Sequence, residues 1–119
     1  MLDKPPIIYL IYIHIVSSYN PEEAQMTKIT VLCWQEIPSV VEAKDGKNVH
    51  KIELSQKFQE LIDLIAMKRG LDGTDEYLMH WNKTQRPELN VGPTEAAESV
   101  AAQIEASYET VKADAIANS

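Results

Sequence analysis

The chain has 119 residues, a formal net charge of −7 and a single cysteine. This length suits one domain with one hydrophobic core, and the acidic balance is a poor match for nucleic acid, because neutralising phosphates requires clustered Lys and Arg. One cysteine excludes an intramolecular disulfide, a CxxC redox pair and a cysteine zinc site, which fits a reducing compartment such as the cytoplasm.

The first 25 residues differ from the rest, with an apolar run from Ile7 to Val16 and a polar, turn-like stretch after it. Four interpretations remain open. The first is a signal peptide, although this segment has no charged start and no cleavage site. The second is a membrane anchor, although the run is shorter than the roughly 20 residues that a span needs. The third is an added β-strand, which Ile and Tyr favour, and the fourth is sequence upstream of a natural start at Met26. We treat residues 1–25 as an extension outside the domain, with membrane attachment only if this run is a real anchor.

The stretch from Lys28 to Gln35 predicts a β-strand. Its alternating positions are apolar on both faces, which is typical of a strand in the middle of a sheet. Pro38 cannot donate a ladder hydrogen bond and restricts Ile37, so the strand is predicted to end and turn at this corner.

A hairpin is predicted next, from a strand at 39–43 and a return strand at 49–54. Asp45 and Gly46 favour the turn between them, because both residue types tolerate positive φ. His50 falls on the same side of the return strand as Ile52, and the pattern does not fix the register.

Apolar residues at helical spacing predict three helices. The first follows Ser55, whose hydroxyl is expected to cap it, and stops at Gly70. The second is short and follows Thr74, and the third opens at Pro93. The predicted buried faces are Phe58, Leu61, Ile62, Ile65 and Ala66; then Tyr77, Leu78 and Trp81; then Val100, Ile104, Tyr108, Val111 and Ala115.

Residues 82–92 read as a connection, with a short edge strand as an option at 88–91. The element order β-β-β-α-α-(β)-α predicts an α+β two-layer sandwich, in which helices cover a small, mainly antiparallel sheet. We expect the domain to span residues 26–116 and the tail 117–119 to fray.

No motif points to catalysis, a cofactor or a metal ion. His14, His50 and His80 lie outside HxH, HxxxH and HExxH patterns, and no glycine-rich phosphate loop or GxSxG motif is present. Cys33 has no flanking cations to activate it and is expected to be a buried packing residue. We therefore assign no catalytic, cofactor-binding or metal-binding residue.

The two tryptophans are candidates for either core packing or a partner interface, where this residue type is enriched. Trp34 stands at the end of its strand, beside the predicted corner at Ile37 and Pro38. The candidate interaction residues are Trp34, Ile37, Pro38 and Trp81.

A set of short motifs follows a fixed order along the chain. They are Trp34-Gln35-Glu36-Ile37-Pro38, Phe58-Gln59, Ile62-Asp63, Ala66-Met67, Gly70-Leu71, Gly73-Thr74-Asp75, Tyr77-Leu78 and Trp81. Taken in this order, the motifs resemble those of the small bacterial "virulence factor" domain family. The resemblance spans about Met26 to Tyr108, and its order and spacing are more specific than any single motif.

The resemblance implies an accessory module, alone or within larger proteins, with no established catalytic residues to transfer. In larger proteins such a domain can accompany iron–sulfur scaffold segments, but this chain lacks the cysteines for a cluster. The leading hypothesis is a cytoplasmic, non-enzymatic module that binds a protein and no nucleic acid. The alternative is a small enzyme, or a subunit of one, with a pocket between sheet and helices that draws on His50, His80, Tyr77 and Glu36.

Overall fold

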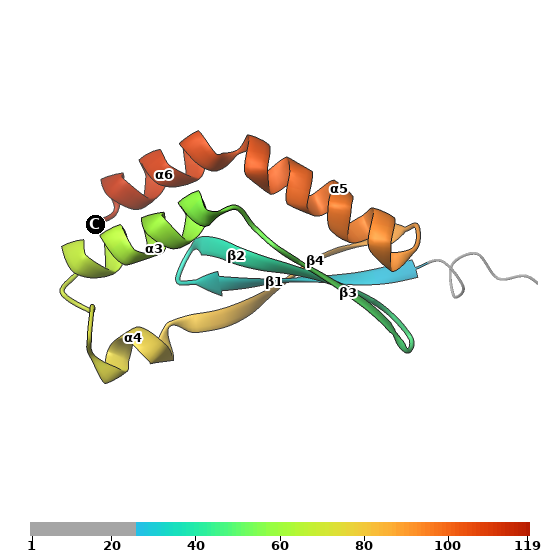
Figure 1. The fold of residues 1–119 in the computed structure, drawn as a ribbon, viewed down its shortest axis with the longest axis horizontal. Coiled ribbons are helices and arrows are strands. Elements are labelled where there is room, and N and C mark those ends of the chain that lie inside the picture. The colour runs from blue at the N-terminus through green and yellow to red at the C-terminus, as the bar shows by residue number, and fades with distance from the viewer. Residues whose placement is uncertain (1–25) are drawn as a thin grey trace, which may run out of the picture.

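The computed structural model describes residues 26–119; the N-terminal segment, with its four interpretations, lies outside the described part. The chain forms a four-stranded antiparallel sheet with the strand order β3-β2-β1-β4, accompanied by helices (Figure 1). This confirms the predicted α+β fold with β1 inside the sheet. The elements are β1 Met26–Trp34, β2 Ile37–Asp45, β3 Asn48–Glu53, α3 Gln56–Lys68, α4 Asp75–Met79, β4 Trp81–Asn90, α5 Pro93–Ala106 and α6 Tyr108–Ala117.

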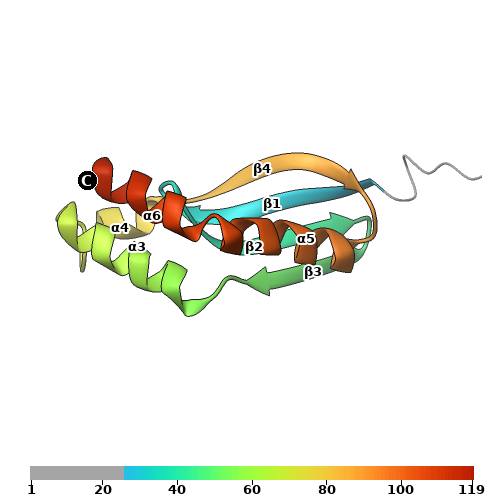
Figure 2. The same ribbon diagram turned by 90° about the horizontal axis from the view of Figure 1, so that it is seen from above.

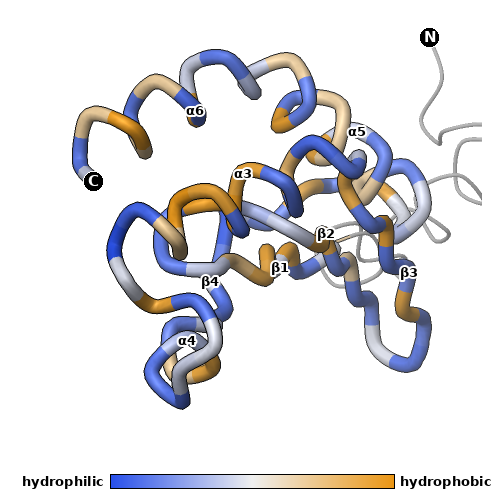
Figure 3. Tube along the Cα trace, turned by 60° about the vertical axis from the view of Figure 1, so that its left-hand side comes forward, coloured by the Kyte–Doolittle hydropathy of each residue, from blue (hydrophilic) through white to orange (hydrophobic). Residues whose placement is uncertain are grey.

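Helices α3, α5 and α6 cover one face of the sheet, and α4 lies on the other side at one end (Figure 1). Helix α5 packs over β2 and β3, while α6 continues from it and packs against α3. The face under these helices carries the buried residues of β1, Ile29 and Val31, which alternate with half-buried Thr30 and Leu32. The predicted buried stripe of α3 is confirmed, and the hydrophobic stretches of β1 and α3 stand out in Figure 3.

The first hairpin turns two residues earlier than predicted. Gln35 and Glu36 form the turn, and Gln35 adopts a left-handed φ of 51°. Pro38 therefore does not end a strand; it lies inside β2, opposite Cys33 at a shift of the register. Such an irregularity tolerates proline because the regular ladder, with its demand for an N–H donor, is interrupted there.

Strand β4 is much longer than the optional edge strand at 88–91, since it runs for 10 residues from Trp81 to Asn90. Its side chains are almost all exposed, so it lacks the apolar alternation that sequence patterns detect. Pro87 stands where the register between β1 and β4 shifts, which an edge strand tolerates. The same strand includes Trp81, which the sequence had placed on a helical face.

The predicted last helix is two helices with a break at Ser107. The Ser107 hydroxyl donates to the carbonyl oxygen of Ile104 at 2.8 Å, a local hydrogen bond that competes with helix continuation and bends helices. The predicted stripe continues through the break, from buried Val100 and Ile104 to buried Ala115. We call the bend between α5 and α6 the elbow.

Of the two predicted side-chain caps at helix N-termini, one forms and the other does not. The Thr74 hydroxyl accepts the backbone N–H of Tyr77 at 3.2 Å, as predicted. The Ser55 hydroxyl does not cap α3; it donates to Glu105 at 2.8 Å instead. Leu78, predicted on the apolar face of the short helix, is 66% exposed; α4 has five residues and no buried side chain, and only Tyr77 is half-buried, where it stacks on Trp34.

Candidate functional site: a groove between strand β4 and the elbow

The helical layer is offset from the sheet and leaves β4 uncovered. Seen from above, α5 lies over β2 and no helix lies over β4 (Figure 2). Asn82, Thr84 and Arg86 stand opposite the inward-facing residues of β1, so they share its inner face. All three are nevertheless exposed. The inner face of the sheet is therefore open along β4.

A cavity of about 230 Å³ lies between this open part of the sheet and the elbow. Its floor consists of the apolar residues Val31, Ile104 and Cys33. Val31 and Ile104 are each only 2% exposed and Cys33 is 8% exposed. We call this cavity the β4 groove. Its lining residues are Val31, Cys33, Gln35, Glu36, Pro38, Thr84, Arg86, Ile104, Ser107 and Val111.

Cys33, in the floor of the groove, is a packing residue with an unreactive thiol. Burial raises the pKa of its thiol, and the hydroxyl of Thr84 and the charge of Arg86 oppose this shift only in part. Its Sγ lies 3.8 Å from the carbonyl oxygen of Val31. Because the thiolate is the nucleophilic form, a thiol kept protonated at neutral pH is a packing group. The structure therefore places Cys33 where the sequence predicted a buried residue.

An ion pair between Glu36 and Arg69 lies at one end of the groove. The Arg69 guanidinium donates to both carboxylate oxygens of Glu36, at 2.9 Å and 3.0 Å. It also donates to the side chain of Gln35 and, at 3.3 Å, to the carbonyl oxygen of Ala115. These hydrogen bonds from Arg69 hold the pKa of the Glu36 carboxyl below its usual value. The negative charge of Glu36 is therefore already paired with Arg69 and does not need a partner from a ligand.

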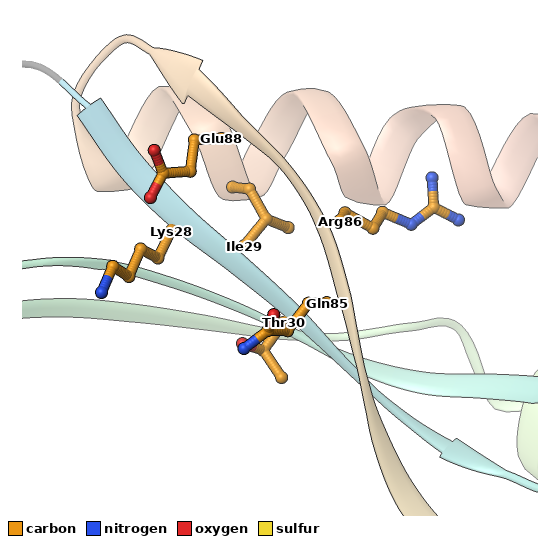
Figure 4. A pocket seen from close by; sticks show the side chains of 6 residues that line it. All are labelled: Lys28, Ile29, Thr30, Gln85, Arg86 and Glu88. Carbon is orange, nitrogen blue, oxygen red and sulfur yellow. The ribbon is translucent and has the colours of Figure 1, made fainter. Parts of the chain in front are cut away.

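The other end is marked by Arg86, whose charge has no ion-pair partner in the part of the chain that the structure describes. Among residues 26–119, no carboxylate lies within salt-bridge distance of its guanidinium. Arg86 also borders a second hollow, of about 300 Å³, which contains Lys28 and Glu88. Figure 4 shows its side chain extending away from those two residues along the sheet. Its guanidinium is the free charge of the groove lining.

The four candidate interaction residues meet at one end of the sheet. Trp34 is opposite both Ile37 and Trp81 in the ladders, and Pro38 lines the β4 groove. Trp34 and Ile37 are 0% exposed, so neither presents side-chain surface to a partner in this conformation. The Trp34 indole donates to the carbonyl oxygen of Tyr77 at 2.8 Å, which makes it part of the core. Trp81 is half-buried and reaches the surface in part.

The polar residues named for an enzymatic pocket are dispersed. Glu36 lines the β4 groove, whereas Tyr77 lines a separate hollow between α3 and α4. His80 packs edge-on against Trp34 with its ring centroid 5.9 Å away, and His50 is on β3 opposite Ala43. The groove residues that sequence reasoning missed are Thr84, Arg86 and Ser107. The first two belong to the strand that has no apolar pattern, and the third to the unpredicted break.

Within residues 26–119, no three His, Cys, Asp or Glu side chains gather as metal ligands would. In the same part of the chain, no helix has the length and apolar character to cross a membrane.

A family model described as "Virulence factor" matches residues 32–116. This range begins inside β1 and extends into α6, so it includes the elbow and every lining residue of the groove except Val31. Neither the search of curated proteins nor the search of solved structures found a match.

Proposed function

The chain belongs to the virulence factor family, and from this we propose that it is a non-enzymatic accessory module that binds another protein in the bacterial cytoplasm. The observation that carries the proposal is the β4 groove, an opening onto the core where the helical layer stops short of the sheet edge. A partner segment in the groove would cover Val31, Cys33 and Ile104, as a further helix of the layer would. Burial of such apolar floor area is what stabilises protein–protein contacts.

The chemistry of the groove favours binding over catalysis. Nucleophilic catalysis needs an activated nucleophile beside a general base, and the Cys33 thiol is kept protonated by burial. General acid or base catalysis by a carboxyl group needs a pKa near the working pH, whereas the pKa of Glu36 is lowered by Arg69. The alternative, a small enzyme with a pocket between sheet and helices, would draw on His50, His80, Tyr77 and Glu36, and of these four residues only Glu36 lines the β4 groove.

To test the proposal, one substitution places a large side chain in the groove, and a matched control places the same side chain elsewhere on the same strand. Thr84 lines the groove, whereas its neighbour Gln85 stands opposite Thr30 on the other face of the sheet. Both are exposed positions in a strand, where Trp is tolerated. Thr84→Trp should fill the groove, and Gln85→Trp should add the same bulk elsewhere.

Full-length protein and both variants would be used to capture partners from bacterial lysate, with quantification by mass spectrometry. We expect at least one protein to be lost by Thr84→Trp and retained by Gln85→Trp. Matching circular dichroism spectra and unfolding midpoints establish that both variants fold. Equal capture by all three proteins would contradict the proposal.

The proposed location has its own test. Cell fractionation should recover the full-length protein with the soluble cytoplasmic contents. Recovery in the membrane pellet that is abolished by removing the run from Ile7 to Val16 would replace this proposal with membrane attachment.

A further inference from the structure

The β4 groove combines an apolar floor with the cationic side chain of Arg86, which makes no ion pair within residues 26–119. We infer that it takes a short peptide segment in which a carboxylate lies next to an aliphatic or aromatic side chain, with the apolar side chain in the cavity and the carboxylate on Arg86. This inference rests on the proposed function and names the chemistry of the partner.

The free charge of the groove is positive. Of the residues that line it, only Glu36 and Arg86 are charged. Glu36 is occupied by two hydrogen bonds from Arg69, while Arg86 makes no ion pair with any residue of the described chain. An occupant that carries a carboxylate therefore supplies the missing partner. The guanidinium fork of arginine suits a carboxylate because it can donate two parallel hydrogen bonds.

The size of the cavity limits the apolar part of the bound peptide segment to about one side chain. Pockets for drug-sized ligands usually measure about 300–1,000 Å³, and the β4 groove encloses about 230 Å³. Val31, Ile104 and Cys33 provide the hydrophobic contacts at its floor. A single large apolar residue fits this volume and buries enough surface to anchor a segment.

The surroundings exclude a polyanion. Helices α5 and α6 border the groove and carry five acidic residues against one lysine, namely Glu95, Glu98, Glu105, Glu109 and Asp114 against Lys112. Such a field repels nucleic acid or a run of phosphates. One carboxylate held directly on Arg86 gains a local contact that outweighs this more distant repulsion. This selects an apolar segment with a single acidic group.

The experiment selects the occupant without assuming its sequence. A random peptide library displayed on phage is panned against the immobilised full-length protein, and the enriched peptides are synthesised and titrated by fluorescence polarisation. We expect the enriched peptides to share an Asp, a Glu or a free C-terminal carboxylate beside a large apolar residue.

Three variants assign the binding to its parts. Arg86→Gln should lower the affinity of the protein for the peptides about tenfold, since it removes a charge that donates hydrogen bonds to the carboxylate. Arg86→Lys keeps the charge and should therefore lose less affinity than Arg86→Gln. Lys83→Gln removes a charge from the same strand on the opposite face, opposite Leu32, and should change affinity by less than about twofold. Amidation of the peptide carboxylate should weaken binding to the native protein and add nothing to the loss in Arg86→Gln.

The outcomes separate the two proposals. If Thr84→Trp abolishes binding while Arg86→Gln matches Lys83→Gln, the carboxylate inference is wrong and the groove remains a binding site. If the peptides bind Thr84→Trp as well as the native protein, the groove is not the site and both proposals fail. If no peptide is enriched over an empty support, the inference is overturned, and the groove-dependent capture experiment alone decides the proposed function.

Discussion

Trp34 closes the end of the sheet on which the β4 groove is built. It is the largest side chain that is completely buried, and its ring stacks on Tyr77 with centroids 5.4 Å apart. Replacing Trp34 with Ala removes this packing and leaves the carbonyl oxygen of Tyr77 without its indole donor. We expect the free energy of unfolding to fall by about 3–5 kcal/mol, measured by urea denaturation followed by circular dichroism.

Trp34→Phe serves as the graded control. It keeps an aromatic ring and loses the hydrogen bond, so its loss should be smaller, about 1–3 kcal/mol. Unchanged stability in Trp34→Ala would show that the indole contributes nothing to the core. A partner lost by this variant would report unfolding rather than a removed contact, which is why the groove variants are the cleaner test of binding.

The ion pair between Glu36 and Arg69 makes stability depend on pH. The pKa of Glu36 is lowered by hydrogen bonds from Arg69, so the unfolded chain takes up this proton more readily than the folded one. The stabilisation is complete above the ordinary carboxyl pKa and is lost as the pH falls through the lowered pKa of the folded state. Because Glu36 is 39% exposed, solvent screening keeps the effect below about 1 kcal/mol.

We therefore expect Glu36→Gln to be slightly less stable than the native protein at neutral pH and equally stable in acid. Urea midpoints measured from pH 7 down to about pH 2 would follow this convergence. Glu60→Gln, at an exposed position of α3, controls for the loss of one negative charge. A gap between Glu36→Gln and the native protein that persists at the lowest pH would contradict the assignment.

At the scale of elements, helix α5 caps helix α3 through Glu105. The Glu105 carboxylate accepts the backbone N–H of Ser55 at 2.7 Å and the Ser55 hydroxyl at 2.8 Å, and Lys57 lies 3.8 Å away. An anion at a helix N-terminus is stabilised by the free N–H groups and by the helix dipole. Glu105→Gln should cost about 1 kcal/mol in urea unfolding.

Glu98→Gln is the matched control for this capping contact, because Glu98 is exposed and lies in α5 beyond its first turn, away from any helix N-terminus. Its effect should be near zero. The cost of Glu105→Gln should also shrink in high salt, because added ions screen the interaction. Equal costs for the two variants would show that overall charge, and not the contact with Ser55, is responsible.

These elements also show which parts of the fold a sequence can predict. The stripe of α3 was predictable because Phe58 and Ile62 are buried on one face of an amphipathic helix. Strand β4 was not, because an edge strand with exposed side chains has no apolar alternation. The break at Ser107 was hidden because the apolar stripe continues across it. The β4 groove is bounded by these two features, so Arg86 could not be recognised as a site residue.

At the scale of the whole molecule, the two faces of the sheet explain why α3, α5 and α6 all cover the same one. The face under α5 carries Ile29, Val31 and Val41, whereas Lys28 and Lys44 stand directly opposite each other on the other face. Lys51 on that face pairs with Glu42 at 3.5 Å. A sheet with one apolar and one charged face is stable with a single covering layer. These three helices therefore gather on one side, with only the short α4 at one end of the other, and their offset from β4 leaves the groove.

The described sheet and helices form one continuous core, and this leads to a last prediction about the extent of the domain. We propose that residues 1–25 are dispensable for folding and predict that a chain beginning at Met26 unfolds within about 0.5 kcal/mol of the full-length protein, the range of changes outside the core. Urea denaturation and overlay of amide NMR spectra would measure this. A chain beginning at Leu32 should not fold, because it lacks most of β1, the strand that joins β2 to β4. A shortened chain from Met26 that loses stability by several kcal/mol would place part of the first 25 residues in the folded domain.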